Sequence, residues 1–270
     1  MSFDADDWGR SSNEYDHKIG PHLTKDYAND LIERLDLLQE HETLEIAAGT
    51  GQLTLEIAKK ARHVLATDIS QKMLWVLKKR LVENQISNVK TAEMNGEALG
   101  LDTSTFDRVV CMFGLMLFDS PDLGIREIKR VLKPLGQVAI SVWGIPDHFE
   151  MMQLFANTTN SFLPNQLRLD LSKNPAFKLS NASHLKGLFV DSEFSSISID
   201  TVSHAKSFAS IDDLWAILAS DAPPLKWFTD ALPADQHTAL RLKIGEACVR
   251  NFGHFPIQLE SEALLLSAKA

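Results

Sequence analysis

Short apolar runs alternate along the chain with stretches in which apolar residues recur every three or four positions. The runs predict buried strands, and the stretches between them predict helices. The predicted strands end near residue 46 and span 63–68, 88–94, 106–112, 137–143, 194–203 and 262–268. Because strands and helices alternate through the first half of the chain, we expect an α/β fold with a mostly parallel sheet.

Two further regions flank this alternating core. Before the first strand, residues 24–38 carry apolar side chains at helical spacing, with Thr24 as a suitable N-cap. After residue 143, helical patterns rich in Phe, Met and Leu extend to about residue 190, and Ser210 caps a further helix. The chain therefore divides into an N-terminal arm and leading helix (1–39), a ligand-binding core (40–145), and a helical region with the last two strands (146–270).

A glycine-rich turn follows the first strand. Gly49 and Gly51 let the backbone approach a ligand without an intervening Cβ, and a helix with free N–H groups begins after them. Asp68 ends the next apolar run, 17 residues after Gly51, near the spacing of an acid that hydrogen-bonds ribose hydroxyls. The turn and the acid predict a nucleoside-bearing cofactor; the alternatives are a structural turn and an aspartate that caps one.

The residues around the turn distinguish two cofactor classes. A dinucleotide-binding turn reads G-x-G-x-x-G, but Thr54 occupies the third glycine position here and Ala47 the first. Glu45, at the strand end, would repel a pyrophosphate and suits a cationic ligand with an ammonium and a sulfonium. The turn therefore favours S-adenosylmethionine (SAM) over NAD.

Several motifs arrive in the order found in one enzyme family. Residues 45–51 (Glu-Ile-Ala-Ala-Gly-Thr-Gly) resemble the first motif of class I SAM-dependent methyltransferases, and residues 130–136 resemble the motif before their fifth strand. The resemblance covers roughly residues 40–145 and is strongest to the small-molecule branch related to quinone and natural-product methyltransferases. It implies a Rossmann-like sheet of seven mostly parallel strands, whose last strand runs antiparallel between the fifth and sixth, with helical lid insertions.

The resemblance also implies which residues hold SAM and its product S-adenosylhomocysteine. Asn95 stands where the family usually has Asp, but its carbonyl oxygen can accept a hydrogen bond from an adenine amino group. The expected cofactor contacts are Glu45, Ala47, Gly49, Gly51, Asp68, Ile69, Met73, Asn95, Gly96, Glu97, Met112 and Phe113. The expected acceptor contacts are Tyr15, Met116 and Trp143. Tyr15 lies on an arm that folds over the cofactor in similar enzymes; the alternative is a frayed terminus with an anchoring aromatic residue.

Methyl transfer requires an acceptor atom held in line with the sulfonium. A phenol or quinol acceptor would also benefit from a base, for which His22 and His148 are the candidates, although lone histidines often lie on the surface. The histidines show no metal-ligand spacing, and no Cys-x-x-Cys, nucleophile elbow or phosphate-binding loop is present. We therefore expect no metal, and no hydrolase or P-loop NTPase activity.

The composition limits which partners the protein is expected to bind. A formal net charge of −9 without a Lys/Arg cluster argues against a nucleic-acid partner. The apolar run 109–118 is too short to span a bilayer, and the acidic N-terminus lacks the pattern of a signal peptide. Two cysteines, one of them in a predicted buried strand, fit a reducing compartment. We expect a cytoplasmic protein with a small-molecule partner, whose apolar lid could also form a homodimer surface.

These observations favour a SAM-dependent methyltransferase (EC 2.1.1 type) that transfers a methyl group to a small, apolar or aromatic acceptor by in-line SN2 transfer. Two alternatives remain open at this point. One is an NAD-dependent oxidoreductase on a similar sheet, which the missing glycines and Glu45 disfavour. The other is a non-catalytic SAM-binding protein that retains the fold.

Overall fold

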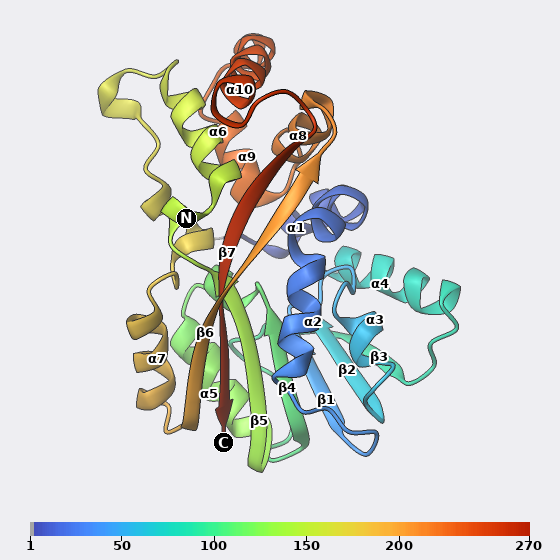
Figure 1. Cartoon of the computed structure of the whole chain (residues 1–270). Coiled ribbons are helices and arrows are strands. Elements are labelled where there is room, and N and C mark those ends of the chain that lie inside the picture. Colours follow the sequence, from blue (N-terminus) through green and yellow to red (C-terminus); the bar gives the residue numbers. More distant parts are fainter. Residues whose placement is uncertain (1–2) are drawn as a thin grey trace.

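A seven-stranded sheet in the order β3-β2-β1-β4-β5-β7-β6 runs through the molecule (Figure 1). The computed structural model describes residues 3–270. The strands are β1 (Glu42–Ile46), β2 (His63–Asp68), β3 (Val89–Glu93), β4 (Phe106–Met112), β5 (Leu132–Trp143), β6 (Ser195–Phe208) and β7 (Ile257–Lys269). Neighbours among β1–β5 pair in parallel, whereas β7 is antiparallel to both β5 and β6. The predicted Rossmann-like architecture, with the last strand antiparallel between the fifth and sixth, is confirmed.

Helices cover both faces of the sheet and the carboxyl ends of its parallel strands. They are α1 (Ala5–Glu14), α2 (Lys25–Glu33), α3 (Thr54–Ile57), α4 (Gln71–Glu83), α5 (Pro121–Val131), α6 (Glu150–Asn160), α7 (Ala182–Asp191), α8 (Ile211–Leu218), α9 (Pro223–Thr229) and α10 (His237–Phe252). A π-helical segment, η1 (Tyr15–Thr24), joins α1 to α2. Short 3₁₀ turns are η2 (Leu115–Leu117), η3 (Pro146–His148), η4 (Asn165–Leu167), η5 (Leu171–Lys173), η6 (Pro175–Phe177) and η7 (Ala234–Gln236).

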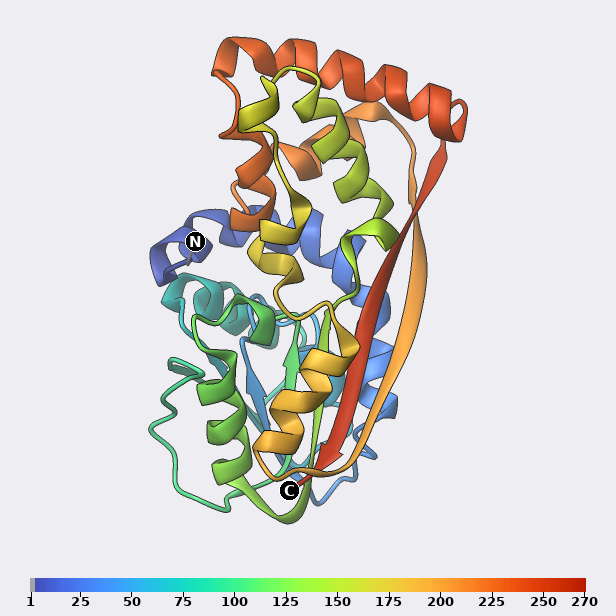
Figure 2. The same ribbon diagram turned by 90° about the vertical axis from the view of Figure 1, so that its left-hand side faces the viewer.

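The helices occupy different positions around the sheet. Figure 2 shows α2 on one face and α5 and α7 on the other, with α6, α8, α9 and α10 beyond the strand ends. We call this last group the lid. Open α/β sheets bind ligands at the carboxyl ends of their strands, so the lid stands where an acceptor would enter.

Apolar side chains from both helix layers form the core between helices and sheet. Leu31 and Leu35 of the α2 region and Ile125 and Ile128 of α5 are fully buried in one continuous cluster. The hydroxyl of Tyr27 donates to the Ser261 carbonyl at 2.6 Å and so fixes α2 against β7. Within residues 3–270, we find no helix that combines the length and the apolar character needed to cross a membrane.

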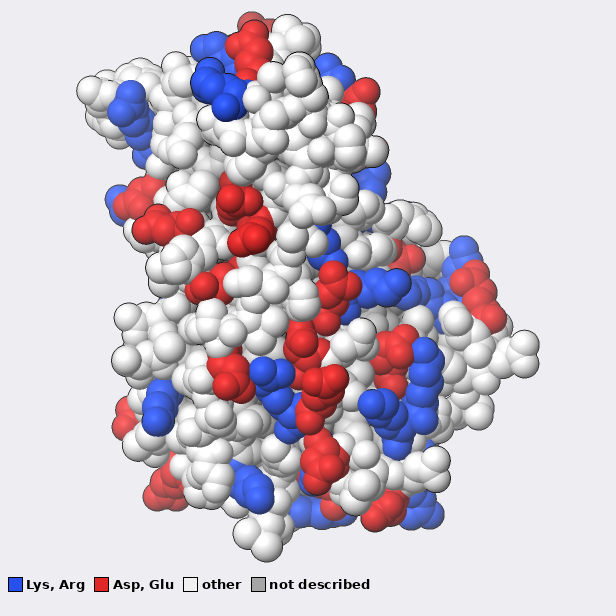
Figure 3. Space-filling model, viewed as in Figure 1, with Lys and Arg blue, Asp and Glu red and all other residues white. Residues whose placement is uncertain are grey.

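Charged side chains of both signs are mixed over the face that carries α2. Figure 3 shows Lys and Arg lying among Asp and Glu across this face. Two ion pairs join the α2 region to β6, one between Arg34 and Asp200 and one between Lys206 and Asp26. The charges on this face therefore serve to pair neighbouring elements rather than to form one broad basic surface.

The N-terminal region differs from the prediction of a helix over 24–38. The α-helix α2 does begin directly after Thr24, but the chain is already helical from Ala5 onward. The Thr24 hydroxyl makes no capping hydrogen bond and donates to the Gly20 carbonyl of the preceding turn. The helix also ends earlier, at Glu33. The reason is that helical residues before Thr24 already accept the backbone hydrogen bonds that a cap would otherwise satisfy. The region before residue 24 is therefore structured, and α1 packs against α4.

Candidate functional site

The turn between β1 and α3 has an unusual backbone. Ala47, Gly49 and Gly51 adopt φ values of +57°, +56° and +91°, in the left-handed region that favours glycine. A Cβ on Gly51 would also approach Leu77 Cδ1 to 2.3 Å, so this position requires glycine. A Cβ on Gly49 would instead enter open space, where the nearest atom is Tyr15 Cε1 at 3.9 Å. The turn thus presents bare backbone toward the space above β1.

Asp68 holds this turn in place. One of its carboxylate oxygens accepts from the Gly49 N–H at 2.8 Å, and the other accepts from the Ser70 N–H at 2.8 Å. Burial raises the pKa of Asp68 to about 6, although these backbone donors oppose the shift. The acid at the end of β2 is therefore joined directly to the glycine turn of β1.

Glu45, near the end of β1, is the second buried acid beside the turn. Its side chain is 1% exposed, and burial raises its pKa to about 8. Its Oε2 atom has no hydrogen-bond partner among residues 3–270. At neutral pH the Glu45 carboxyl is therefore mostly protonated in the free protein, unlike the ionised carboxylate that the sequence suggested.

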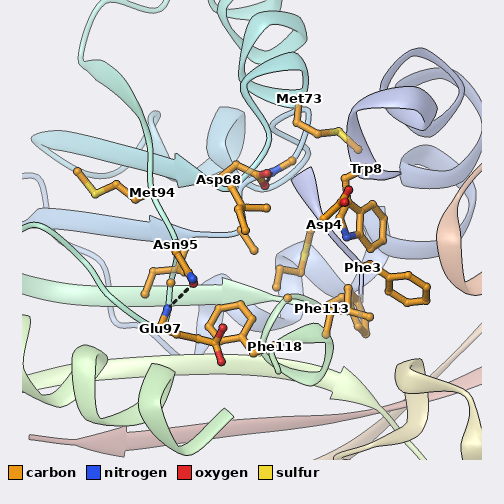
Figure 4. A pocket seen from close by; sticks show the side chains of 18 of the residues that line it. Phe3, Asp4, Trp8, Asp68, Met73, Met94, Asn95, Glu97, Phe113 and Phe118 are labelled. Atoms are coloured by element: carbon orange, nitrogen blue, oxygen red, sulfur yellow. Dashed lines mark hydrogen bonds between the residues drawn. The ribbon is translucent and has the colours of Figure 1, made fainter. Parts of the chain in front are cut away.

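A cavity of about 260 Å³ opens over the carboxyl ends of β1, β2 and β4 (Figure 4). Four carboxylates line it, from Asp4, Asp68, Glu97 and Asp119, together with apolar side chains. No Lys, Arg or His belongs to its wall within the described part of the chain. The cavity is therefore suited to a ligand that is partly apolar and carries positive charge.

Most of the predicted cofactor contacts meet in this cavity. Its wall contains Ala47, Gly49, Asp68, Ile69, Met73, Asn95, Gly96, Glu97, Met112 and Phe113. Glu45 and Gly51 are not part of the wall: Glu45 is buried in the core behind it, and Gly51 packs against α4. Figure 4 shows Asn95, Glu97 and Phe118 on the side of the cavity opposite Phe3, Asp4 and Trp8.

Sequence reasoning missed the part of the wall that comes from the N-terminus, from the segment after β4, and from two apolar residues at the ends of β1 and β3. The additional lining residues are Phe3, Asp4, Trp8, Ile46, Met94, Gly114, Leu117, Phe118 and Asp119. Asp4 and Asp7 form a capping box at the start of α1, and this Asp-x-x-Asp spacing was the available sequence signal for a helix there. That helix would have placed Trp8 one turn from its start.

A second, smaller cavity of about 70 Å³ adjoins the first and shares the side chains of Trp8, Tyr15, Phe113 and Leu117 with it. Tyr15 therefore borders both cavities, whereas the other predicted acceptor contacts, Met116 and Trp143, border only the smaller one.

Phe113 lies between the two cavities and borders both. Its backbone conformation is constrained. Its φ is +55°, which is uncommon for a bulky residue and often marks a functional position. Its ring stacks on Trp143 with ring centroids 4.0 Å apart and meets the edge of Tyr27 at 5.3 Å.

The structure does not bring the two candidate histidines to either cavity. His22 is exposed on η1, where its Nδ1 lies 2.7 Å from the Lys18 carbonyl oxygen. His148 is also exposed and pairs with Glu262 at 2.8 Å. Both side chains point to the outside of segments whose neighbouring residues, Leu23 and Phe149, line the smaller cavity. Groups of three or more His, Cys, Asp or Glu side chains able to hold a metal ion are not found in residues 3–270.

A mostly buried ion pair holds the N-terminal segment over the larger cavity. Arg80 of α4 donates from Nη1 to Asp16 of η1 at 2.8 Å and to the Thr50 carbonyl at 3.1 Å. The Asp16 side chain is only 12% exposed. One guanidinium therefore connects the glycine turn with the segment that carries Tyr15, and we call α1 and η1 together the cover.

Comparisons with known proteins agree on one family. A family model described as a methyltransferase domain matches residues 43–136. A ubiquinone/menaquinone biosynthesis C-methyltransferase of Shewanella sediminis is 30% identical over 169 residues, covering 58% of this chain and 67% of that protein. A 2-methyl-6-phytyl-1,4-hydroquinone methyltransferase of Oryza sativa is 31% identical over 166 residues, covering 61% and 47%. The chain spans about half the length of several such relatives, between 47% and 57%.

Solved structures show the same fold. The YcgJ protein of a Bacillus species superposes with a TM-score of 0.60 at 19% identity, covering 90% of this chain and 97% of that one. A phosphoethanolamine N-methyltransferase of Haemonchus contortus, solved with SAM, gives a TM-score of 0.58 at 15% identity, covering 90% and 52%. At these identities the likeness concerns the fold alone.

Proposed function

Because the chain belongs to the class I SAM-dependent methyltransferase family, we propose that it transfers a methyl group from SAM to a small-molecule acceptor. The observation that carries this proposal is the charge of the larger cavity, which four carboxylates line without a basic side chain from residues 3–270. Such walls favour a ligand with an ammonium and a sulfonium. They disfavour NAD, whose pyrophosphate would lie among like charges.

The residues present fit SAM in shape as well as in charge. The bare backbone of Gly49 leaves room for close approach of a ligand. Asp68 stands at the end of β2, where an acid can accept hydrogen bonds from ribose hydroxyls. Asn95 lies further along the same wall, and Ile69 and Phe118 offer apolar surface for an adenine. When bound, SAM supplies an electrophilic methyl group on a sulfonium.

The chain's own residues then exclude water and fix orientation. The cover places Trp8 and Tyr15 over the cavity, and Phe113 closes it from the β4 side. Holding two reactants in line can supply about 7–11 kcal/mol of the barrier in well-oriented systems. Burial raises the pKa of Tyr15 to about 12, so its phenol keeps its proton at neutral pH and serves as a hydrogen-bond donor.

The acceptor class, the cellular location, the oligomeric state and the division of the chain are part of the same proposal. The net charge of −9 supports a small acceptor rather than a nucleic acid. Cytoplasmic location and a homodimer built on the lid stay predictions. We also keep the division at residues 39 and 145, with one qualification: β6 and β7, both from the third part, complete the sheet of the core.

Calorimetric titration of the full chain with SAM, S-adenosylhomocysteine and NAD tests the proposal. We expect the two adenosyl ligands to bind and NAD to remain inert. Gly49→Val should weaken S-adenosylhomocysteine binding at least about tenfold, because a side chain would fill the space above the turn. Gly253→Val is the matched control, since Gly253 also has a positive φ, of +88°, and a Cβ there meets no atom within 4 Å. Binding of NAD alone, or undiminished affinity in a folded Gly49→Val protein, would overturn the assignment.

A further inference from the structure

The smaller cavity has walls of a different character from the larger one. It carries no Asp, Glu, Lys, Arg or His among the described residues, although it opens beside four carboxylates. The side chains in its wall with N–H or O–H groups are Trp8, Tyr15, Thr24 and Trp143, and the Thr24 hydroxyl already donates to Gly20. A charged group placed there would lose its hydration without gaining an ionic partner, which costs several kcal/mol.

Aromatic side chains make up part of the wall of this cavity. Trp143 stacks on Phe113 with an interplanar angle of 24°, and its ring centroid lies 4.8 Å from that of Phe149. The lid side contributes the residues that we call the roof, which are Met152 of α6, Ala176 of η6, and Ala222, Pro224 and Leu225 at the start of α9. A wall rich in aromatic rings accommodates a planar apolar group better than a branched one.

The size of the cavity limits what can enter. Its volume of about 70 Å³ is less than half of the roughly 150 Å³ of a cavity that holds a benzene. A single ring therefore fits only if one edge stays in the opening toward the larger cavity. Tyr15 borders that opening, so the exposed edge of the ring would lie beside its phenol and face the site assigned to SAM.

From these features, and resting on the proposed function, we propose that the smaller cavity is the acceptor pocket and selects an uncharged acceptor with a single planar ring. The inner edge of the ring packs between the aromatic wall and the roof, and the reacting atom lies at the opening near Tyr15. The roof residues fall outside residues 43–136, which the family model matches, so this selection is a property of the chain's own lid region.

Equilibrium binding in the presence of S-adenosylhomocysteine tests the proposal without depending on which atom is methylated. The probes are aniline, which is uncharged, 4-aminobenzoate, which adds a carboxylate, and 1-naphthylamine, which adds a fused ring. Binding is followed by the fluorescence of the tryptophans, two of which, Trp8 and Trp143, border the pocket. We expect aniline to bind at least about tenfold more tightly than either of the other two amines.

Substitutions in the wall of the smaller cavity distinguish a specific effect on acceptor binding from a general effect on the fold. Ala222→Leu and Ala176→Leu, which fill the pocket from two different elements, should each weaken aniline binding at least about tenfold and leave S-adenosylhomocysteine affinity unchanged. Met152→Ala, which enlarges it, should strengthen 1-naphthylamine binding about fivefold or more. Ala247→Leu is the control, because Ala247 is equally buried in the lid but borders neither cavity.

The outcomes distinguish the two proposals. A wild-type protein that does not bind S-adenosylhomocysteine would overturn the proposed function and the acceptor pocket with it. Normal S-adenosylhomocysteine binding together with no aniline binding would overturn the acceptor pocket alone. The same conclusion would follow if 4-aminobenzoate bound as tightly as aniline, or if the filling and enlarging variants all behaved like Ala247→Leu.

Discussion

The buried carboxyl of Glu45 should make the stability of the free protein depend on pH. Burial raises the Glu45 pKa from 4.5 to about 8, and its Oε2 atom has no hydrogen-bond partner within residues 3–270. Because the folded protein holds this proton more tightly than the unfolded chain, the contribution to stability is fully present below pH 4.5. It is lost as the pH rises through about 8.

The size of this loss follows from the two pKa values. At about 1.4 kcal/mol per pH unit, the interval between 4.5 and about 8 corresponds to roughly 5 kcal/mol. Glu45→Gln keeps the shape of the side chain and removes its titration. The variant should therefore lose less stability than the wild type between pH 5 and pH 9, and the difference should approach several kcal/mol at the alkaline end.

Urea denaturation at pH 5, 7 and 9, followed by tryptophan fluorescence, measures this effect. Glu42→Gln is the control, since Glu42 lies on the same strand but is partly exposed and pairs with His63. We expect the control to retain the alkaline loss of stability shown by the wild type. If Glu45→Gln and the wild type showed the same pH dependence, Glu45 would not be a protonated buried acid in the free protein.

Three further predictions concern the turn, the cover and the histidines. Ala47→Gly should stabilise the protein by up to about 1 kcal/mol in urea denaturation, because it relieves a φ of +57°; a loss of stability would contradict this reasoning. Arg80→Ala should cost about 1–3 kcal/mol by leaving Asp16 without its partner, and hydrogen exchange in residues 5–24 should rise if Arg80 holds the cover. His22→Ala and His148→Ala should each keep kcat/KM within about twofold of the wild type, and a large loss in either would place that histidine in the reaction.

The sheet could be predicted from sequence because its inner strands are short, apolar and separated by clear helical patterns. The prediction was less accurate at β5, which begins at Leu132 rather than at residue 137, and at β6 and β7, which extend beyond the expected 194–203 and 262–268. β6 is the edge strand, and most of its side chains are exposed or only partly buried. Its apolar residues therefore do not mark its full length, and the antiparallel pairing with β7 extends past the region that the hydrophobic pattern reveals.

The cavity was predictable where it is built from backbone motifs and less so where it is built from tertiary packing. The glycine turn and Asp68 have fixed spacing because the fold requires them at adjacent strand ends. Phe3, Asp4 and Trp8 reach the cavity only because α1 packs against α4, and no local pattern specifies that contact. Sequence spacing likewise could not reveal that the His148 side chain faces Glu262 and solvent.

Several unfavourable features of this fold lie at the cavity or directly behind it. The left-handed backbone at Ala47 and Phe113 and the raised pKa values of Glu45 and Asp68 all occur at the ends of β1, β2 and β4. Positions of this kind persist only where the surrounding structure holds them, and they commonly mark sites of function. A cationic ligand would favour the ionised form of both acids, so bound SAM should offset part of the alkaline loss of stability. The stabilisation by SAM should accordingly be larger at pH 9 than at pH 6, and it should change less with pH in Glu45→Gln.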